Sequence, residues 1–259
     1  MFNLEEERFS FDNFKNTSLW ELAKSVRDDD ANKVREIVSL HKPDIDFKEP
    51  NFHQILLALA IQNNKRDAFI ELLKAKADPN LLVGPINDAT PFIYSIKNLG
   101  NCDLYYVENL LKHGADPNFK IVNPQEGSYF ENSYPLLVAI GNRKDNGREC
   151  LELVRLLVNY GADINCCYNN PLTEMCEGVL NECLISNSMI TLSYFVIEKK
   201  IAIPNSVFVE GSFDKTSQEV YSLSEILNTD DYRFESESLS HLRKSRNDVL
   251  EYLKSNINK

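Results

Sequence analysis

The spacing of apolar residues along the chain predicts helices that each bury one side. In three segments, an apolar residue is followed at the third and fourth positions by two more, which places all three on one helical face. These triplets are Phe69, Leu72 and Leu73, then Val107, Leu110 and Leu111, then Val154, Leu157 and Val158. A shorter, mostly apolar run precedes each triplet, at residues 54–63, 89–98 and 133–142. The chain is therefore predicted to contain successive pairs of helices.

A similar polar sequence follows each triplet. It reads LLKAKADPN at 72–80, LLKHGADPN at 110–118 and LVNYGADIN at 157–165. Gly114 and Gly161 end two of these helices, where glycine adopts the left-handed conformation of a helix terminus without strain. Lys76 occupies the equivalent position in the first copy, and keeping that conformation there costs on the order of 1 kcal/mol. The residues that follow are typical of turns, so each helix pair is predicted to end in a turn.

Two weaker copies of this ending flank the three clear ones. They finish at Asp46 and Asn205, and each has one extra residue before its turn. Two of the first helices begin with Pro91 and Pro135, and proline is tolerated there because its missing N–H would have no partner anyway. A helix pair this short cannot bury its own apolar face, so it must stack on its neighbours. About five stacked repeats are predicted over residues 17–205.

These features resemble ankyrin repeats, whose unit of about 33 residues runs from a TPLH motif into a helix pair and then a GADPN turn. Thr90-Pro91 and residues 115–118 match the family pattern most closely. The resemblance implies an all-α solenoid with β-turn finger loops that recognises other proteins. Ile93 and Leu137 stand where the family has histidine. The Thr and His side chains that normally tie neighbouring turns together are therefore expected to be largely missing, and the array is expected to be less stable than a consensus one.

The ends of the chain are predicted to cap this ankyrin-repeat solenoid, because a terminal repeat has no neighbour on one side. Residues 1–16 are assigned to an N-terminal extension, 17–205 to the repeat array and 206–259 to C-terminal capping helices. In the first repeat, Trp20 and Val26 are expected to face inward with Leu22 and Ala23. In the segment 236–257, apolar residues at helical spacing predict a closing helix over the last repeat; they are Leu239, Leu242, Val249, Leu250 and Leu253.

Charge narrows the range of partners. Lys and Arg total 28 against 39 Asp and Glu, which gives a formal net charge of −11. A negative field repels phosphate backbones and anionic membranes, so neither nucleic acid nor a membrane is expected as a partner, and a protein with a basic surface is favoured. The sequence shows neither a signal-peptide pattern nor a run of roughly 18 apolar residues. We expect a cytoplasmic monomer.

The residues that could form catalytic or metal sites have simpler interpretations. Four cysteines lie within residues 166–183, but they lack the paired C-x₂-C spacing of a zinc site, so packed thiols are expected. The histidines have no nucleophile–base constellation beside them in the sequence; they are His41, His53, His113 and His241. No phosphate-binding glycine motif occurs. We predict no metal, no cofactor and no enzymatic activity; a hidden enzyme site in residues 206–259 is the minor alternative.

The loops between repeats are the predicted partner-binding elements. The loop 119–134 is longer than a finger turn needs, and two interpretations of its aromatic residues remain open: they pack on the neighbouring finger, or Tyr129 and Phe130 anchor a partner. The predicted contact residues are Phe47, Lys48, Asn51, Phe52, Phe119, Lys120, Tyr129, Phe130, Tyr168 and Asn169. The tail around 230–238 is similar to some type IV secretion signals, so the alternative is a bacterial effector that is secreted into a host cell and binds a host protein.

Overall fold

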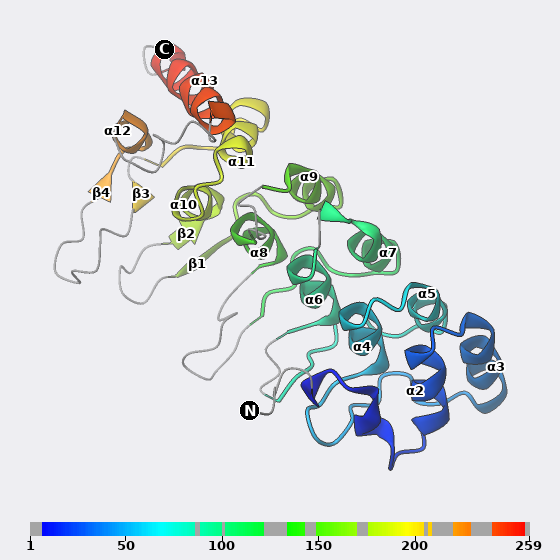
Figure 1. Cartoon of the computed structure of the whole chain (residues 1–259). Coiled ribbons are helices and arrows are strands. Elements are labelled where there is room, and N and C mark those ends of the chain that lie inside the picture. Colours follow the sequence, from blue (N-terminus) through cyan, green and yellow to red (C-terminus); the bar gives the residue numbers. More distant parts are fainter. Residues whose placement is uncertain are drawn as a thin grey trace. The chain divides into compact units, whose positions relative to one another are not determined.

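The fold is mostly helical and divides into two units, Met1–Pro135 (unit 1) and Leu136–Lys259 (unit 2). Figure 1 shows the elements of the computed structural model along the chain. The residues that the structure describes are 7–85, 89–99, 102–121, 134–142, 149–169, 176–204, 207–208, 220–228 and 240–256.

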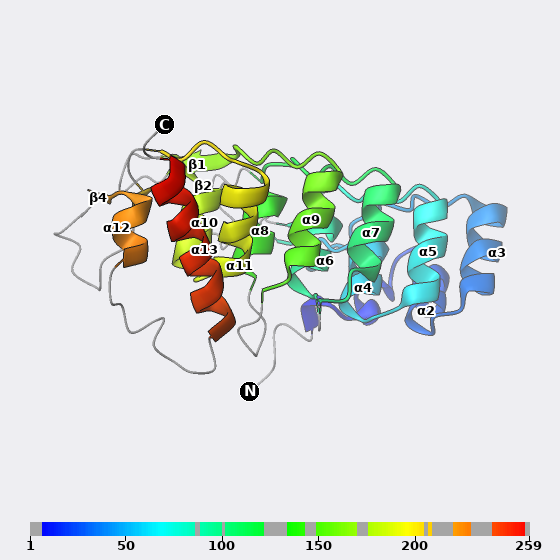
Figure 2. The same cartoon turned by 90° about the horizontal axis from the view of Figure 1, so that it is seen from above.

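In its described residues, unit 1 has three helix pairs, with a short 3₁₀ helix before them. The elements are η1 (Phe11–Phe14), α2 (Trp20–Arg27), α3 (Ala31–His41), α4 (Leu56–Gln62), α5 (Arg66–Lys74), α6 (Pro91–Lys97) and α7 (Tyr105–Lys112). The first helices α2, α4 and α6 form one layer, in which α4 packs on both others. The second helices α3, α5 and α7 form the other layer, seen side by side in Figure 2. The predicted helix pairs are confirmed in this unit.

The buried residues explain why the two layers differ in sequence. Helix α4 lies between α2, α5 and α6, and all residues from Leu56 to Ile61 are buried. The second helices bury one stripe only, and every residue of the three predicted triplets is buried except Val158, which is half-buried. Helix α6 begins as predicted, because Thr90 Oγ1 accepts a hydrogen bond of 3.1 Å from the Ile93 amide and Pro91 occupies the first turn.

The helix ends adopt the left-handed conformation that the sequence predicts. Gly114 and Gly161 have φ of 96° and 91°, and Lys76 has φ of 72° despite its side chain. The two weaker copies also turn through left-handed residues, Lys42 at 43° and Lys200 at 51°. The strained backbone at Lys76 is therefore a real feature of the first clear turn.

Unit 2 has helix pairs and two short strand pairs. Its elements are α8 (Pro135–Gly141, which begins at the last residue of unit 1), α9 (Leu151–Asn159), β1 (Cys167–Asn169), β2 (Cys176–Gly178), α10 (Val179–Ile185), α11 (Met189–Ser193), η3 (Tyr194–Glu198), β3 (Val207–Phe208), β4 (Val220–Tyr221), α12 (Leu223–Asn228) and α13 (Ser240–Asn256). Strand β1 pairs antiparallel with β2, with Tyr168 opposite Glu177, and β3 pairs with β4. The sequence predicted turns at these places but no strands.

The extra residue before the last turn is accommodated by a π-helix. Segment η3 continues α11, and the amide of Lys199 donates to the carbonyl of Tyr194, five residues earlier. A π-bulge is the usual way in which a helix absorbs one additional residue. The closing helix α13 packs on α11, η3 and α12, with Val249, Leu250 and Leu253 buried.

One expectation about the first repeat is wrong. Trp20 is half-buried rather than inward-facing, and three cations surround its ring: Lys15, Lys24 and Arg27, at 6.0, 5.6 and 5.9 Å from the ring centre. An indole that keeps its face near the surface gains from such cations. A solenoid running through both units, and the boundaries at residues 16 and 205, remain predictions.

Candidate functional site

The finger turns share one internal hydrogen bond. In each, an aspartate accepts from the amide two residues later: Asp78 from Asn80, Asp116 from Asn118, and Asp163 from Asn165, all at 2.8 Å. This is the aspartate-closed turn that the Asp-Pro-Asn pattern favours. The local sequence therefore sets the shape of each turn by itself.

Side chains also join successive turns within unit 1. Asp46 Oδ1 accepts from the Asp78 amide at 2.9 Å, and Asn80 Oδ1 accepts from the Asp116 amide at 2.8 Å. Asn80 Nδ2 also donates to the Gly114 carbonyl at 2.9 Å. We call this series of bonds the turn ladder. The links between turns here come from the Asp and Asn residues of the turns themselves, which the sequence did not predict.

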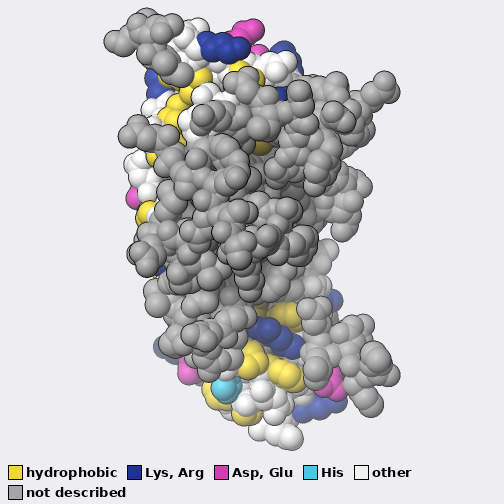
Figure 3. Space-filling view, turned by 90° about the vertical axis from the view of Figure 1, so that its left-hand side faces the viewer, with side chains coloured by type: hydrophobic (Ala, Val, Ile, Leu, Met, Phe, Trp, Pro, Cys, Tyr) yellow, Lys and Arg dark blue, Asp and Glu magenta, His cyan; other side chains and the backbone are white. Residues whose placement is uncertain are grey.

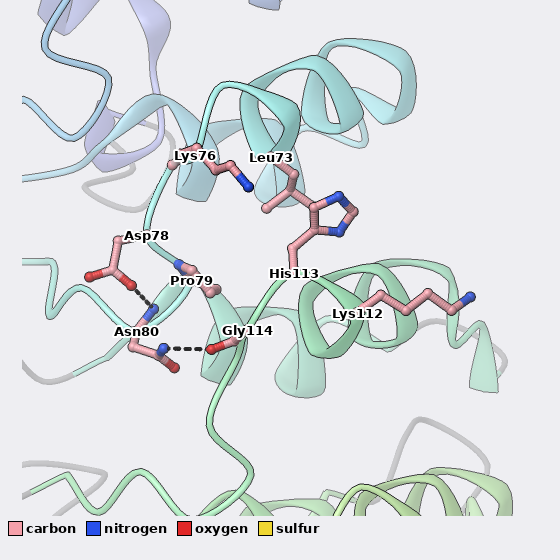
Figure 4. A pocket seen from close by; sticks show the side chains of 9 residues that line it. Leu73, Lys76, Asp78, Pro79, Asn80, Lys112, His113 and Gly114 are labelled. Atoms are coloured by element: carbon pink, nitrogen blue, oxygen red, sulfur yellow. Dashed lines mark hydrogen bonds between the residues drawn. The ribbon is translucent and has the colours of Figure 1, made fainter.

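A cleft opens beside this ladder, between the first clear turn and the end of α7 (Figure 4). Its volume is about 420 Å³, and Leu73, Lys76, Pro79 and Asn80 lie on one side, with His113 and Gly114 on the other. The Lys76 side chain extends toward His113, whereas Lys112, which also lines the cleft, extends away from it (Figure 4). His113 Nδ1 lies 2.7 Å from the Asn109 carbonyl oxygen. Its lining also includes Asp78, so the cleft contains charges of both signs.

The loop that carries four predicted contact residues is held by a buried carboxylate. Glu49 is fully buried, and its oxygens accept from the amides of Asn51 (2.7 Å), Phe52 (2.8 Å) and Gln54 (3.1 Å). Three amide donors compensate the buried charge. Asn51 is consequently held at the surface and Phe52 half-buried. Glu49 was not identified from the sequence. Its position directly before a proline and three polar or aromatic residues could have indicated a turn that its carboxylate closes.

The other predicted residues fall into separate places. Phe47 packs its ring against buried Phe14, with centroids 6.3 Å apart, so it also supports the fold. Lys48 is half-buried in the same loop, and Phe119 is half-buried after a later turn. Lys120 is exposed, with Nζ 5.4 Å from the centre of the Tyr134 ring.

Of the remaining four predicted contact residues, two lie on strand β1 and two lie outside the described residues. Tyr168 and Asn169 lie on strand β1 of unit 2, and Tyr168 is half-buried. Tyr129 and Phe130 lie outside the described residues. The structure thus brings together Phe47, Lys48, Asn51 and Phe52 in one loop.

The N-terminal segment 7–14 lies on the first helices of unit 1. Arg8 Nη2 donates to the Tyr94 hydroxyl at 2.6 Å, and the Phe9 ring meets the Tyr94 ring edge-on at 5.6 Å. Phe11 and Phe14 are buried. In Figure 3, dark-blue basic side chains border yellow hydrophobic ones toward the lower end of the face, near the N-terminal elements.

The cysteines differ from the predicted set of packed thiols. Cys167 and Cys176 form a disulfide with Cα atoms 5.4 Å apart, because the β1–β2 hairpin brings them to the separation that a disulfide needs. Cys166 and Cys183 are free and buried, as predicted. Burial raises the pKa of Cys166 to about 12 and the pKa of Cys183 well above its usual value. Thiols in this state are poor nucleophiles and poor metal ligands.

Helix pairs joined by aspartate-closed turns define a helical repeat protein. The family model named Ankyrin repeat matches residues 131–169, so this part of the chain has the sequence of one ankyrin repeat. A comparison with curated proteins found no match. In the part of the chain that the structure describes, no helix has the length and apolarity that crossing a membrane requires.

Proposed function

We propose that this protein is a non-enzymatic recognition module that binds another protein through its finger turns and first helices. The turn ladder carries this proposal. Its bonds hold Asp46, Asp78, Asn80 and Asp116 in a fixed relation within unit 1. A surface that is ordered before binding loses less conformational entropy when a partner docks. Ankyrin repeats generally serve as protein-binding modules, which supports the same conclusion.

The proposed partner is a protein with a basic surface, because the chain carries a formal charge of −11. We propose that the chain binds it as a cytoplasmic monomer and needs no nucleic acid, membrane or cofactor. The proposed contact residues are Phe47, Lys48, Asn51, Phe52, Phe119, Lys120, Tyr129, Phe130, Tyr168 and Asn169. Among the described ones, Asn51 and Lys120 are the most exposed.

The burial of Cys166 and Cys183, which raises the pKa of both thiols, argues against a cysteine nucleophile at either position. The effector alternative rests on the tail around 230–238, which lies outside the described residues. Delivery into a host cell would change where the partner is found, and the binding surface would stay the same.

Affinity capture with matched variants tests the proposal. The test variant is Phe52→Ala/Phe119→Ala, which removes two half-buried rings from the finger loops of unit 1. The control is Leu40→Ala, which removes an apolar side chain that is 68% exposed on the second helix α3. Equal melting temperatures establish that both variants remain folded.

The outcomes show which side of the molecule carries the interface, the finger loops or the second helices. A protein captured by the wild type and by Leu40→Ala, but lost with the double variant, supports binding through the fingers. A protein lost only with Leu40→Ala places the interface on the second-helix layer and contradicts the proposed surface. Failure of the wild type to retain any protein from candidate lysates counts against recognition as the function.

A further inference from the structure

Part of the proposed binding surface is already occupied by the chain itself. Residues 7–14 contact first helices and a finger loop, the two kinds of element through which unit 1 is proposed to bind. Figure 1 shows η1, in dark blue, on the first-helix side of this unit. Asn63, which ends α4, donates from Nδ2 to the Phe9 carbonyl at 3.0 Å, and Phe14 packs on Phe47 of the finger loop.

The segment has an anchored part and a more exposed tip. Phe11 and Phe14 are 4% and 0% exposed, so they belong to the core of unit 1. Arg8 and Phe9 are only half-buried, so they are less buried than the two anchors, and both contact Tyr94. The Arg8 guanidinium carbon lies 5.4 Å from the Phe9 ring centre and 5.9 Å from that of Tyr94. The tip can therefore leave while the anchors stay in place.

The receiving surface is polar at its centre. Gln54 is fully buried, and its side-chain nitrogen lies 3.4 Å from the Tyr94 hydroxyl that accepts from Arg8. The side-chain oxygen of Gln54 is also buried and makes no hydrogen bond. Buried acceptors are nearly always satisfied in native proteins. The internal tip thus leaves one acceptor unused, and a guanidinium with its five N–H donors is suited to reach it.

We infer that the surface formed by Gln54, Asn63 and Tyr94 is a receptor for an arginine–aromatic peptide segment, and that Arg8 and Phe9 act as its internal competitor. An external segment with arginine followed by an aromatic residue would repeat the bonds that Arg8 and Phe9 make. This inference rests on the proposed function and specifies the chemistry of the partner on unit 1.

The acidic character of the chain agrees with this choice. An arginine-bearing partner is attracted by the net charge of −11. The internal tip has the advantage of attachment, because a short tether supplies an effective concentration in the mM range. A peptide added from solution therefore competes poorly with the wild-type tip and well with a disabled one.

The test uses the full chain and a defined probe. The probe is a fluorescein-labelled peptide with the chain's own first ten residues, and its binding is measured by fluorescence anisotropy. The open variant is Arg8→Ala/Phe9→Ala, and the matched control is Lys15→Ala/Asn16→Ala, which changes two exposed residues that follow η1. Circular dichroism and melting temperature confirm that both are folded. Phe9→Ala alone serves as a milder version of the open variant.

The peptide is expected to bind the open variant about ten-fold more tightly than the wild type or the control. Replacing Tyr94 by Phe in the open variant should weaken this binding several-fold, and a peptide with alanine at positions 8 and 9 should not bind. Equal affinity for wild type and open variant would refute the internal competitor. No binding to any form would refute the receptor. Because the probe is a defined peptide and needs no natural partner, failure of this test does not decide the affinity-capture test of the finger loops. The two proposals can therefore fail separately.

Discussion

Glu71 provides the sharpest test of how neighbouring repeats are joined. It lies on α5, is 6% exposed, and accepts two bonds from Arg35 of α3: from Nε to Oε2 and from Nη2 to Oε1, both at 2.9 Å. Lys74 Nζ donates to Oε1 at 2.8 Å. This bidentate contact ties the second helices of two repeats together. We expect Glu71→Gln, which removes the charge and keeps the shape, to lower the free energy of unfolding at neutral pH.

The magnitude follows from the pKa of the Glu71 carboxyl. Hydrogen bonding to Arg35 is the main cause that lowers this pKa from its ordinary value of 4.5 to about 2. Each pKa unit corresponds to about 1.36 kcal/mol, so this shift limits the contribution of the Glu71 charge to the free energy of unfolding to about 3 kcal/mol. The side chains of Arg35 and Lys74 are 56% and 58% exposed, so water screens the interaction. We therefore expect a loss of about 1–2 kcal/mol.

The pH dependence has a definite sign. Because the folded protein lowers the pKa of Glu71, the stabilisation is fully present above pH 4.5 and is lost as the pH falls toward about 2. The difference in unfolding free energy between wild type and Glu71→Gln should therefore shrink in acid.

Urea denaturation followed by circular dichroism measures this difference at neutral pH and at about pH 3. Glu108→Gln is the control, since Glu108 is 43% exposed and lies 3.5 Å from Lys112; its effect should stay below about 0.5 kcal/mol. A Glu71→Gln penalty that is absent at neutral pH, or equally large in acid, would show that the ion pair does not join the repeats as argued.

Three further expectations concern the turns and the thiols. Asn80→Ala removes the bonds to Gly114 and Asp116 and should lower the free energy of unfolding by about 1–2 kcal/mol; an unchanged urea midpoint would contradict the turn ladder. Lys76→Gly should raise that free energy by about 0.5–1 kcal/mol by relieving a left-handed residue, whereas Gly114→Ala, where nothing lies within 4 Å of an added Cβ, should lower it by about 1 kcal/mol. Effects of the same sign would refute the backbone argument. Iodoacetamide should leave Cys166 and Cys183 unmodified in the native protein and alkylate both after denaturation, and native labelling detected by mass spectrometry would disprove their burial.

The helix pairs could be predicted because their signals are local. The apolar triplets have the period of a helix, and the residue after each second helix must turn left-handed whether it is Gly114 or Lys76. Equivalent positions in the copies made Lys76 recognisable although its residue type argues against that conformation. The stacking of pairs within unit 1 then followed from the need to bury both faces of the first helices.

Features that depend on distant pairings could not be predicted in this way. The bond from Arg8 to Tyr94 joins residues 86 positions apart, and no local pattern specifies it. The β1–β2 hairpin has strands of only three residues, too short for a period to show, so the Cys167–Cys176 bond was also missed. Asn80 was recognised as a turn residue, but its bond to the next turn exists only once the repeats are stacked.

Bonds between repeats also complete the starts of two second helices. Helix α5 has no side-chain cap of its own at Lys65, and Asp29 of the preceding repeat accepts from the Ala68 amide at 2.9 Å instead. Within unit 2, Glu149 accepts from the amides of Ile190 (3.0 Å) and Thr191 (2.7 Å) at the start of α11. Helix N-termini expose amides that need acceptors, and here the preceding helix pair supplies them. Helices α5 and α11 are therefore complete only when the preceding helix pair is folded, which makes these bonds between repeats part of their own stability.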